Sequence, residues 1–98
     1  MEIQNMKFEV GEIIVTPAAS AVLQTHGHTH DDLLARHQAG DWGDVSSQLR
    51  LVNEQGLAES FNLQSTYEMP CGQRIAVVTN RDRSITMIHL DPQHSSGT

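Results

Sequence analysis

From residue 60 onward, polar and apolar side chains alternate, and this period of two is the feature that most constrains the fold. The residues at every second position are Phe61, Leu63, Ser65, Tyr67 and Met69. Such spacing places side chains on one face of a β-strand. Short turns at 70–72 and 80–83 lead into two further segments rich in Ile and Val, 74–79 and 84–90. Consecutive strands joined by tight turns pair antiparallel, so this half predicts a three-stranded antiparallel meander.

The first 25 residues predict one strand followed by a short helix. Residues 8–15 are rich in β-branched side chains, which favour a strand. Thr16 is a good helix cap and Pro17 suits the first helical position, so a helix should run from Pro17 to about Gln24. The strand should join an edge of the sheet, because alone it would leave its backbone groups unpaired.

Two more helices are expected before the meander. Thr29 and Asp32 have the spacing of a capping box, which predicts a helix that ends near Gly40. A third helix should begin at 44–47 and stop at Gly56. The side chains expected to point inward from that helix are Leu49, Leu51 and Val52.

The predicted architecture is therefore α+β: an N-terminal strand, three short helices and the meander, with the helices on one face of the sheet. Residues 1–90 should form one domain, because a chain of 98 residues holds one modest core. The polar segment 91–98 is expected to be a disordered tail.

Charge and motif content exclude several classes of function. Six Lys and Arg against twelve Asp and Glu give a net charge of −6, of which −5 falls on residues 1–49. Broad nucleic-acid binding needs a basic surface, so it is not expected. The sequence has no glycine-rich phosphate loop, paired-cysteine motif or serine nucleophile elbow, so we expect no cofactor.

The same features suggest where the protein acts. Cys71 is the only cysteine, which excludes an intrachain disulfide and favours a reducing compartment. The N-terminus lacks the pattern of a signal peptide, and no apolar stretch is long enough for a membrane span. We therefore expect a cytoplasmic protein that does not enter membranes.

The densest cluster of metal-binding side chain types is His26, His28 and His30, followed by two aspartates. Alternating histidines can chelate a metal ion. A polar loop between helices explains them better, because Thr29 and Asp32 already serve as capping residues. Metal binding at the three histidines is thus the weaker hypothesis.

His37 is the most informative histidine, because helical spacing from Leu33 and Leu34 points it toward the core. A buried ring needs partners, and Asp41, Asp44 or Asn53 could supply one. The arrangement is that of a structural histidine or, alternatively, of a ligand site or general base.

Two further features leave alternatives open. Trp42, between two glycines, is either a core anchor or a contact platform. The turn that contains Arg83 is either a solvated hairpin tip or a cradle for an anion. Cys71 lies in a turn with no cation beside it in the sequence, so no catalytic residue is predicted.

Two motifs stand out in the sequence. The first is Arg36-His37 followed by Gly-Asp-Trp-Gly-Asp at 40–44, and the second is Asp-Arg-Ser-x-Thr at 82–86. Together they resemble a family of small uncharacterised bacterial proteins that are often found on plasmids and other mobile elements. The resemblance carries no established activity. It marks as candidate ligand-binding residues Arg36, His37, Asp41, Trp42, Asp44, Asn53, Arg83, Ser84 and Thr86.

Two functions follow as hypotheses. The first is a non-enzymatic accessory module, encoded on a mobile element, that binds a protein partner. The second is a small-ligand or nucleic-acid-binding site built by His37, Asp41, Asn53 and Arg83. Convergence of these four side chains in an open cleft would favour the second hypothesis, whereas mutual hydrogen bonding under Trp42 would make them structural.

Overall fold

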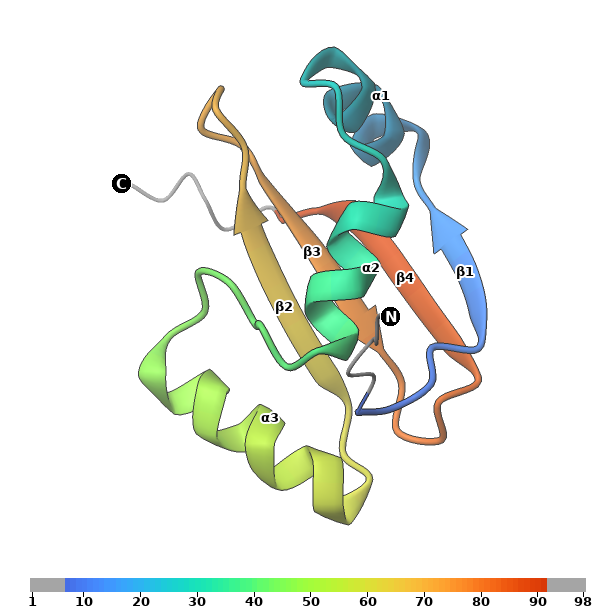
Figure 1. Ribbon diagram of the computed structural model, residues 1–98, viewed down its shortest axis with the longest axis vertical. Coiled ribbons are helices and arrows are strands. Elements are labelled where there is room, and N and C mark those ends of the chain that lie inside the picture. The colour runs from blue at the N-terminus through green and yellow to red at the C-terminus, as the bar shows by residue number, and fades with distance from the viewer. Residues whose placement is uncertain (1–6, 92–98) are drawn as a thin grey trace, which may run out of the picture.

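The computed structural model of the protein describes residues 7–91 and consists of three helices and a four-stranded sheet (Figure 1). The elements in chain order are β1 (Glu12–Val15), α1 (Pro17–Thr25), α2 (His30–Gln38), α3 (Ser47–Glu59), β2 (Leu63–Glu68), β3 (Arg74–Thr79) and β4 (Ile85–Leu90). The predicted α+β class and the three helices are confirmed. The expected tail lies outside the described residues, apart from its first residue, Asp91.

The strands are arranged in the order β1-β4-β3-β2, and the sheet is mixed. β2, β3 and β4 pair antiparallel, with Val77 opposite both Ser65 and Ile88. β1 joins the edge beside β4, as predicted, but runs parallel to it and places Ile14 opposite Met87. The predicted antiparallel meander is present in β2, β3 and β4, but it is part of a four-stranded mixed sheet. All three helices separate β1 from the meander, so no tight turn forces β1 to run antiparallel.

The helices begin where the capping residues predict. Thr16 Oγ1 accepts a hydrogen bond from the Ala19 N–H at 3.2 Å, with Pro17 in the first helical position. Thr29 and Asp32 form both halves of the predicted capping box at the start of α2. Each cap satisfies amide groups that the first helical turn leaves without a partner, which fixes where the helix starts.

The third helix departs from the prediction in its length and its position. α3 continues past Gly56 to Glu59, and Gly56 packs so closely that an added Cβ would lie 3.0 Å from Leu63 Cδ2. Leu51 and Val52, expected to point inward, are 70% and 42% exposed. α3 lies along the β2 edge of the sheet rather than over its face (Figure 1). The buried residues of α3 are Asn53 and Gly56, so this helix adds no side chain to the buried apolar cluster.

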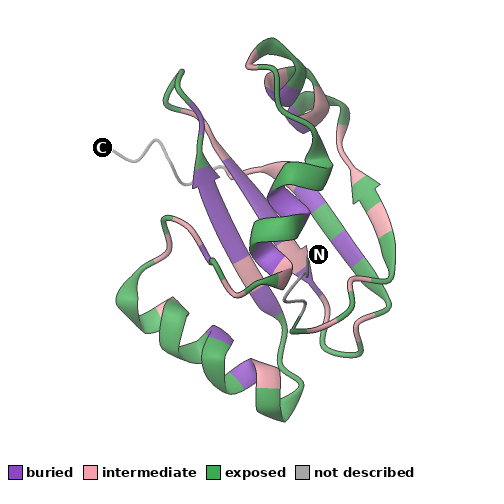
Figure 2. Cartoon of the chain, viewed as in Figure 1, coloured by how far each residue is buried: buried purple, intermediate pink, exposed green. Residues whose placement is uncertain are grey.

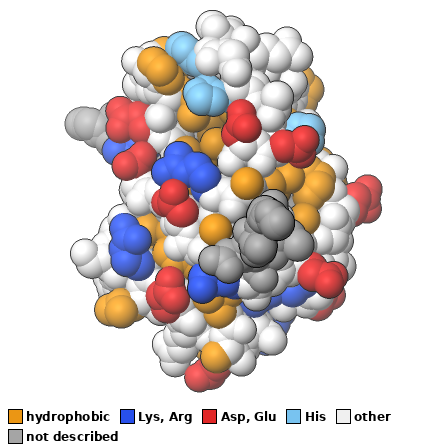
Figure 3. Space-filling model, in the orientation of Figure 1, with side chains coloured by type: hydrophobic (Ala, Val, Ile, Leu, Met, Phe, Trp, Pro, Cys, Tyr) orange, Lys and Arg blue, Asp and Glu red, His pale blue; other side chains and the backbone are white. Residues whose placement is uncertain are grey.

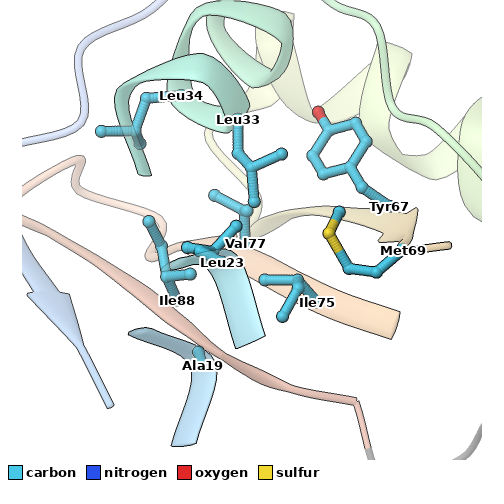
Figure 4. Packing of buried hydrophobic residues seen from close by; sticks show 9 residues of the cluster. All are labelled: Ala19, Leu23, Leu33, Leu34, Tyr67, Met69, Ile75, Val77 and Ile88. Atoms are coloured by element: carbon cyan, nitrogen blue, oxygen red, sulfur yellow. The ribbon is translucent and has the colours of Figure 1, made fainter. Parts of the chain in front are cut away.

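The core lies between one face of the sheet and the helices α1 and α2 (Figures 2 and 4). Leu33 of α2 points toward Val77 and Ile88 on the strands. The buried apolar cluster consists of Ala19, Leu23, Leu33, Leu34, Tyr67, Met69, Ile75, Val77 and Ile88. None of the helices between residues 7 and 91 is both long and apolar enough to cross a membrane.

The opposite side of the sheet carries apolar side chains that the helices leave uncovered. Strand alternation turns Ile14, Ile85 and Met87 away from the core cluster, and they are 37%, 38% and 40% exposed. Val78 lies beside Met87 in the same cross-strand row. We call this surface the outer face; its accessible apolar residues are Ile14, Val78, Ile85 and Met87, whereas Ala76 on the same side is buried.

Candidate functional site

His37 is fully buried and joins α2 to two strands through both ring nitrogens. Its Nδ1 lies 2.5 Å from Ser65 Oγ on β2, and its Nε2 lies 2.9 Å from Thr79 Oγ1 on β3. The prediction that His37 points into the core is confirmed, but the expected partners Asp41, Asp44 and Asn53 are wrong. Ser65 and Thr79 occupy inward positions of the sheet directly below the helix, where the ring can reach them.

The hydrogen bonds around His37 specify one proton arrangement. Thr86 Oγ1 donates to the Val10 carbonyl at 2.8 Å, so its single proton is used. Thr79 must then donate to Thr86 across their 2.6 Å contact, which leaves Thr79 Oγ1 to accept from His37 Nε2–H. Nδ1 is therefore the acceptor, and Ser65 donates to it. The result is a continuous chain of hydrogen bonds that runs from the Ser65 hydroxyl to the Val10 carbonyl, and we call it the His37 network.

The buried setting keeps the His37 ring neutral. Burial, with a smaller effect from the positive charge of Arg83, lowers the pKa of His37 to about 3. A general base needs a lone pair that faces substrate, whereas both nitrogens of this ring bond to the protein's own hydroxyl groups. His37 therefore holds α2 against the sheet.

Trp42 is also fully buried and packs against His37. The ring centroids lie 5.8 Å apart, edge to face, and Phe8 completes the group at 5.0 Å from the His37 centroid. The indole N–H donates to Glu54 Oε2 of α3 at 2.8 Å. Trp42 is therefore a core anchor rather than a contact platform, and its indole hydrogen bond joins the loop to α3.

Asn53 and Asp44 bind the backbone of β2 along its outer edge. The Asn53 amide group donates to the Gln64 carbonyl at 2.8 Å and accepts from the Gln64 N–H at 3.1 Å. One Asp44 carboxylate oxygen accepts from the Glu68 N–H at 3.0 Å. Between these two contacts, the backbone around Gly43 pairs with Thr66 as a short parallel bridge. Side chains and loop thus close this edge of the sheet.

Gly43 is required for that closure. Its φ is +74°, and an added Cβ would lie 2.2 Å from the Thr66 carbonyl oxygen. Only glycine combines a left-handed backbone with such a close approach. Gly43, beside Trp42, therefore lets the loop reach β2.

Arg36 and Asp41 form an ion pair on the surface. Arg36 Nε lies 2.8 Å from Asp41 Oδ2, and both side chains are about half exposed. The guanidinium also lies 4.4 Å from the centroid of the Tyr67 ring, whose hydroxyl donates to the Asp41 carbonyl at 2.6 Å. The hydrogen bond from Arg36 lowers the pKa of Asp41. These contacts hold the loop after α2 against β2.

Arg83 closes the C-terminal end of α3. Its guanidinium donates to the carbonyls of Gly56 at 2.9 Å and Phe61 at 2.7 Å, where Ser60 ends the helix in the left-handed conformation. Carbonyls at a helix end lack partners within the helix, so a cation there supplies them. Ser84 bonds to Asp82 and Asn80 within its own turn, as a hairpin tip does.

The structure thus places the predicted residues in three groups rather than around one opening. His37 and Thr86 belong to the buried network, with Trp42 packed beside it. Asp44 and Asn53 lie on the edge of β2. The remaining four side chains fasten loops and a helix end, and they are Arg36, Asp41, Arg83 and Ser84.

In the histidine-rich segment, His26 and His28 lie in the expected loop between α1 and α2, whereas His30 is the first residue of α2. His28 lies 3.8 Å from Asp32 and His30 lies 3.6 Å from Asp31, each beside one carboxylate. Within residues 7–91, no three His, Cys, Asp or Glu side chains gather closely enough to hold a metal ion. Cys71 is free and exposed.

Searches of protein-family models, curated proteins and solved structures find no match to this chain. The resemblance to mobile-element proteins therefore rests on its two motifs alone.

Sequence reasoning missed the hydroxyl groups that complete the His37 network. Ser65 stands between Leu63 and Tyr67 at an inward position of its strand, and Thr79 ends the inward row of β3. A polar side chain at an inward position of a strand needs a buried hydrogen-bond partner. The alternating pattern of residues 61–69 puts Ser65 at such a position, so the sequence contains this signal.

Proposed function

We propose that the protein is a small non-enzymatic module that binds another protein, and that the outer face forms part of its binding surface. The observation that carries this proposal is the exposure of three large apolar side chains, Ile14, Ile85 and Met87, on one side of a sheet. Contiguous apolar surface of this kind is typical of interaction sites.

The contacts of the polar candidates support the same proposal. His37 and Asn53 are fully buried, and Arg83 is directed to backbone carbonyls at the end of α3. A small-ligand site needs polar groups that converge on a shared space. These three groups bond instead to separate parts of the protein, so the alternative of a ligand or nucleic-acid site has less support.

Charge favours a different protein over a second copy of this chain. Strands spaced about 4.8 Å apart and about 20 Å long give the outer face a plane area of about 380 Å². Any protein packed on this face alone would bury roughly 760 Å² in total, below the roughly 1,000 Å² of a stable interface, so the binding surface has to extend beyond the outer face. Each copy of this chain carries a net charge of −6, which opposes self-association.

The wider setting is proposed on the sequence motifs. Membership of the mobile-element family would make the module an accessory protein of a plasmid or similar element. Its single unpaired cysteine suits the cytoplasm of the host.

A photo-crosslinking experiment tests the proposed surface. Benzoylphenylalanine replaces Met87 on the outer face in one strain and Leu51, which is 70% exposed on α3, in a matched control. We expect the Met87 position to crosslink one defined host protein, and Ile85→Lys to abolish that product. Equal crosslinking from both positions, a product that is this chain itself, or no product at Met87 would overturn the proposal.

A further inference from the structure

The two edges of the sheet differ in how their backbone groups are used. The β2 edge is closed at Gln64, Thr66 and Glu68 by Asn53, the bridge at Gly43, and Asp44. β1 forms the other edge, and no element described in the structure lies beyond it (Figure 1). An edge strand with free N–H and C=O groups is a template for another strand.

The register of β1 identifies the groups that point outward. Glu12 N–H donates to the Ser84 carbonyl and Thr16 N–H donates to the Ile88 carbonyl, so the even-numbered residues face β4. Backbone groups alternate sides along a strand. The N–H and C=O groups of Ile13 and Val15 therefore point away from the sheet, and no backbone hydrogen bond joins them to another part of residues 7–91.

Both sides of this edge have receptive surface. On the helix side, a hollow of about 250 Å³ beside Val15 is lined by Leu23 of the core and by Asp31 at the start of α2. On the other side, Ile14 continues into the apolar outer face. A strand laid along β1 would thus place alternate side chains over the hollow and over Ile14.

The charge at this edge is negative. Glu9 and Glu12 are exposed, and the Asp31 side chain is 83% exposed beside His30. Acidic side chains are visible on this side of the molecule in Figure 3. The nearby cation Arg83 is directed to the end of α3 instead. Rim charges of one sign select partners of the opposite sign.

From these observations we infer that β1 binds an extended, basic segment of the partner protein as a fifth strand. Lys or Arg side chains would lie toward the hollow and Asp31, while apolar side chains would cover Ile14. The inference rests on the proposed function and names the kind of partner that the surface fits. A fifth strand paired with β1 would also enlarge the interface beyond the small outer face, because it adds main-chain hydrogen bonds as well as buried area.

Synthetic peptides test this inference without knowledge of the partner. The probe is a fluorescein-labelled eight-residue peptide in which Val and Lys alternate, and binding is followed by fluorescence anisotropy. Two further versions carry N-methyl groups on alternate amides. One version is methylated along one edge of the peptide strand, and the other version is methylated along the opposite edge. We expect one version to lose at least tenfold in affinity and the other to bind within threefold of the parent. Equal effects of the two versions, or no binding of the parent, would overturn the inference.

Matched variants and amide exchange assign the site. Asp31→Lys should weaken binding of the Val–Lys peptide three- to tenfold, because Asp31 lines the hollow that receives the Lys side chains, whereas Glu59→Lys, the same charge change on α3, should leave it within twofold. Hydrogen exchange at the Ile13 and Val15 amides should slow at least tenfold in the complex. Unchanged exchange at both amides would place the peptide elsewhere and refute strand addition.

The two proposals can fail separately. A defined partner crosslinked at Met87, together with no peptide binding, would retain the binding module and overturn strand addition at β1. Peptide binding that protects Ile13 and Val15, with no crosslinked product at Met87, would support the edge and refute the outer face.

Discussion

Removal of the Asn53 side chain is the most direct test of how the β2 edge is held. Asn53 is fully buried and satisfies both the N–H and the C=O of Gln64, at 3.1 and 2.8 Å. Asn53→Ala deletes both bonds at once and leaves the rest of α3 unchanged. Alanine also has the higher helix propensity, so any loss of stability comes from the contacts with β2.

The expected cost follows from those two hydrogen bonds. Leaving a buried backbone group without a partner costs about 1–3 kcal/mol, so two groups together suggest about 2–6 kcal/mol. The lower end applies if a water molecule enters the space left by the amide and bonds to both groups of Gln64. For a domain of this size, a loss of 2 kcal/mol lowers the melting temperature by roughly 8–16 °C.

Urea denaturation followed by Trp42 fluorescence measures this change, with Asn62→Ala as the control. Asn62 is exposed and lies only nine positions further along the chain. We expect Asn62→Ala to change the free energy of unfolding by less than about 0.5 kcal/mol. A loss below 0.5 kcal/mol for Asn53→Ala would refute the view that this side chain holds the strand. Size-exclusion chromatography of the variant would reveal whether the opened edge self-associates.

Three further changes test other contacts. Burial lowers the pKa of His37 to about 3, so between pH 6.5 and pH 4 the unfolded chain binds a proton at this residue and the folded chain does not. This difference lowers the free energy of unfolding by about 3 kcal/mol as pH falls from 6.5 to 4. His37→Gln should remove that loss and flatten the plot of stability against pH over this range. An unchanged slope in urea titrations across that range would contradict the neutral buried ring. Gly43→Ala should lower the free energy of unfolding by at least about 3 kcal/mol, because its Cβ meets the Thr66 carbonyl, whereas Gly72→Ala, with the same sign of φ and open space, should lose about 1 kcal/mol. Equal urea midpoints for the two glycine variants would disprove the close approach. Arg83→Met should accelerate amide exchange in the last turn of α3 and cost about 1–2 kcal/mol, and unaltered exchange there would exclude its role as a helix cap.

Local signals in the sequence predicted the secondary structure well. Thr16 and Thr29 fix helix starts through their own hydroxyl groups, and the alternation after residue 60 fixes the inward row of β2. Each of these signals acts within a few residues. The parallel direction of β1 depends on a partner strand more than 70 residues away, which no local pattern encodes.

The candidate site was harder to predict because its residue types serve structure as well as chemistry. Asn53 on a helix and Asp44 in a loop are common in binding sites, yet here both bond to strand backbone. The sequence predicts that Gly56 ends a helix, whereas its lack of a side chain lets α3 pack beside Leu63. The sequence specifies these residue types, but only the tertiary arrangement decides which groups they meet.

The contrast between the two sheet edges limits the assemblies that this chain can build. A subunit joins an endless strand-by-strand polymer only if it can pair on both sides, so it needs two available edges. Here Asn53 and Asp44 occupy one edge, so within residues 7–91 the sheet offers only the β1 edge for strand pairing. Such a molecule can end a growing sheet but cannot propagate it. A protein with an exposed strand at β1 is in this way protected from fibre formation while one pairing position stays available.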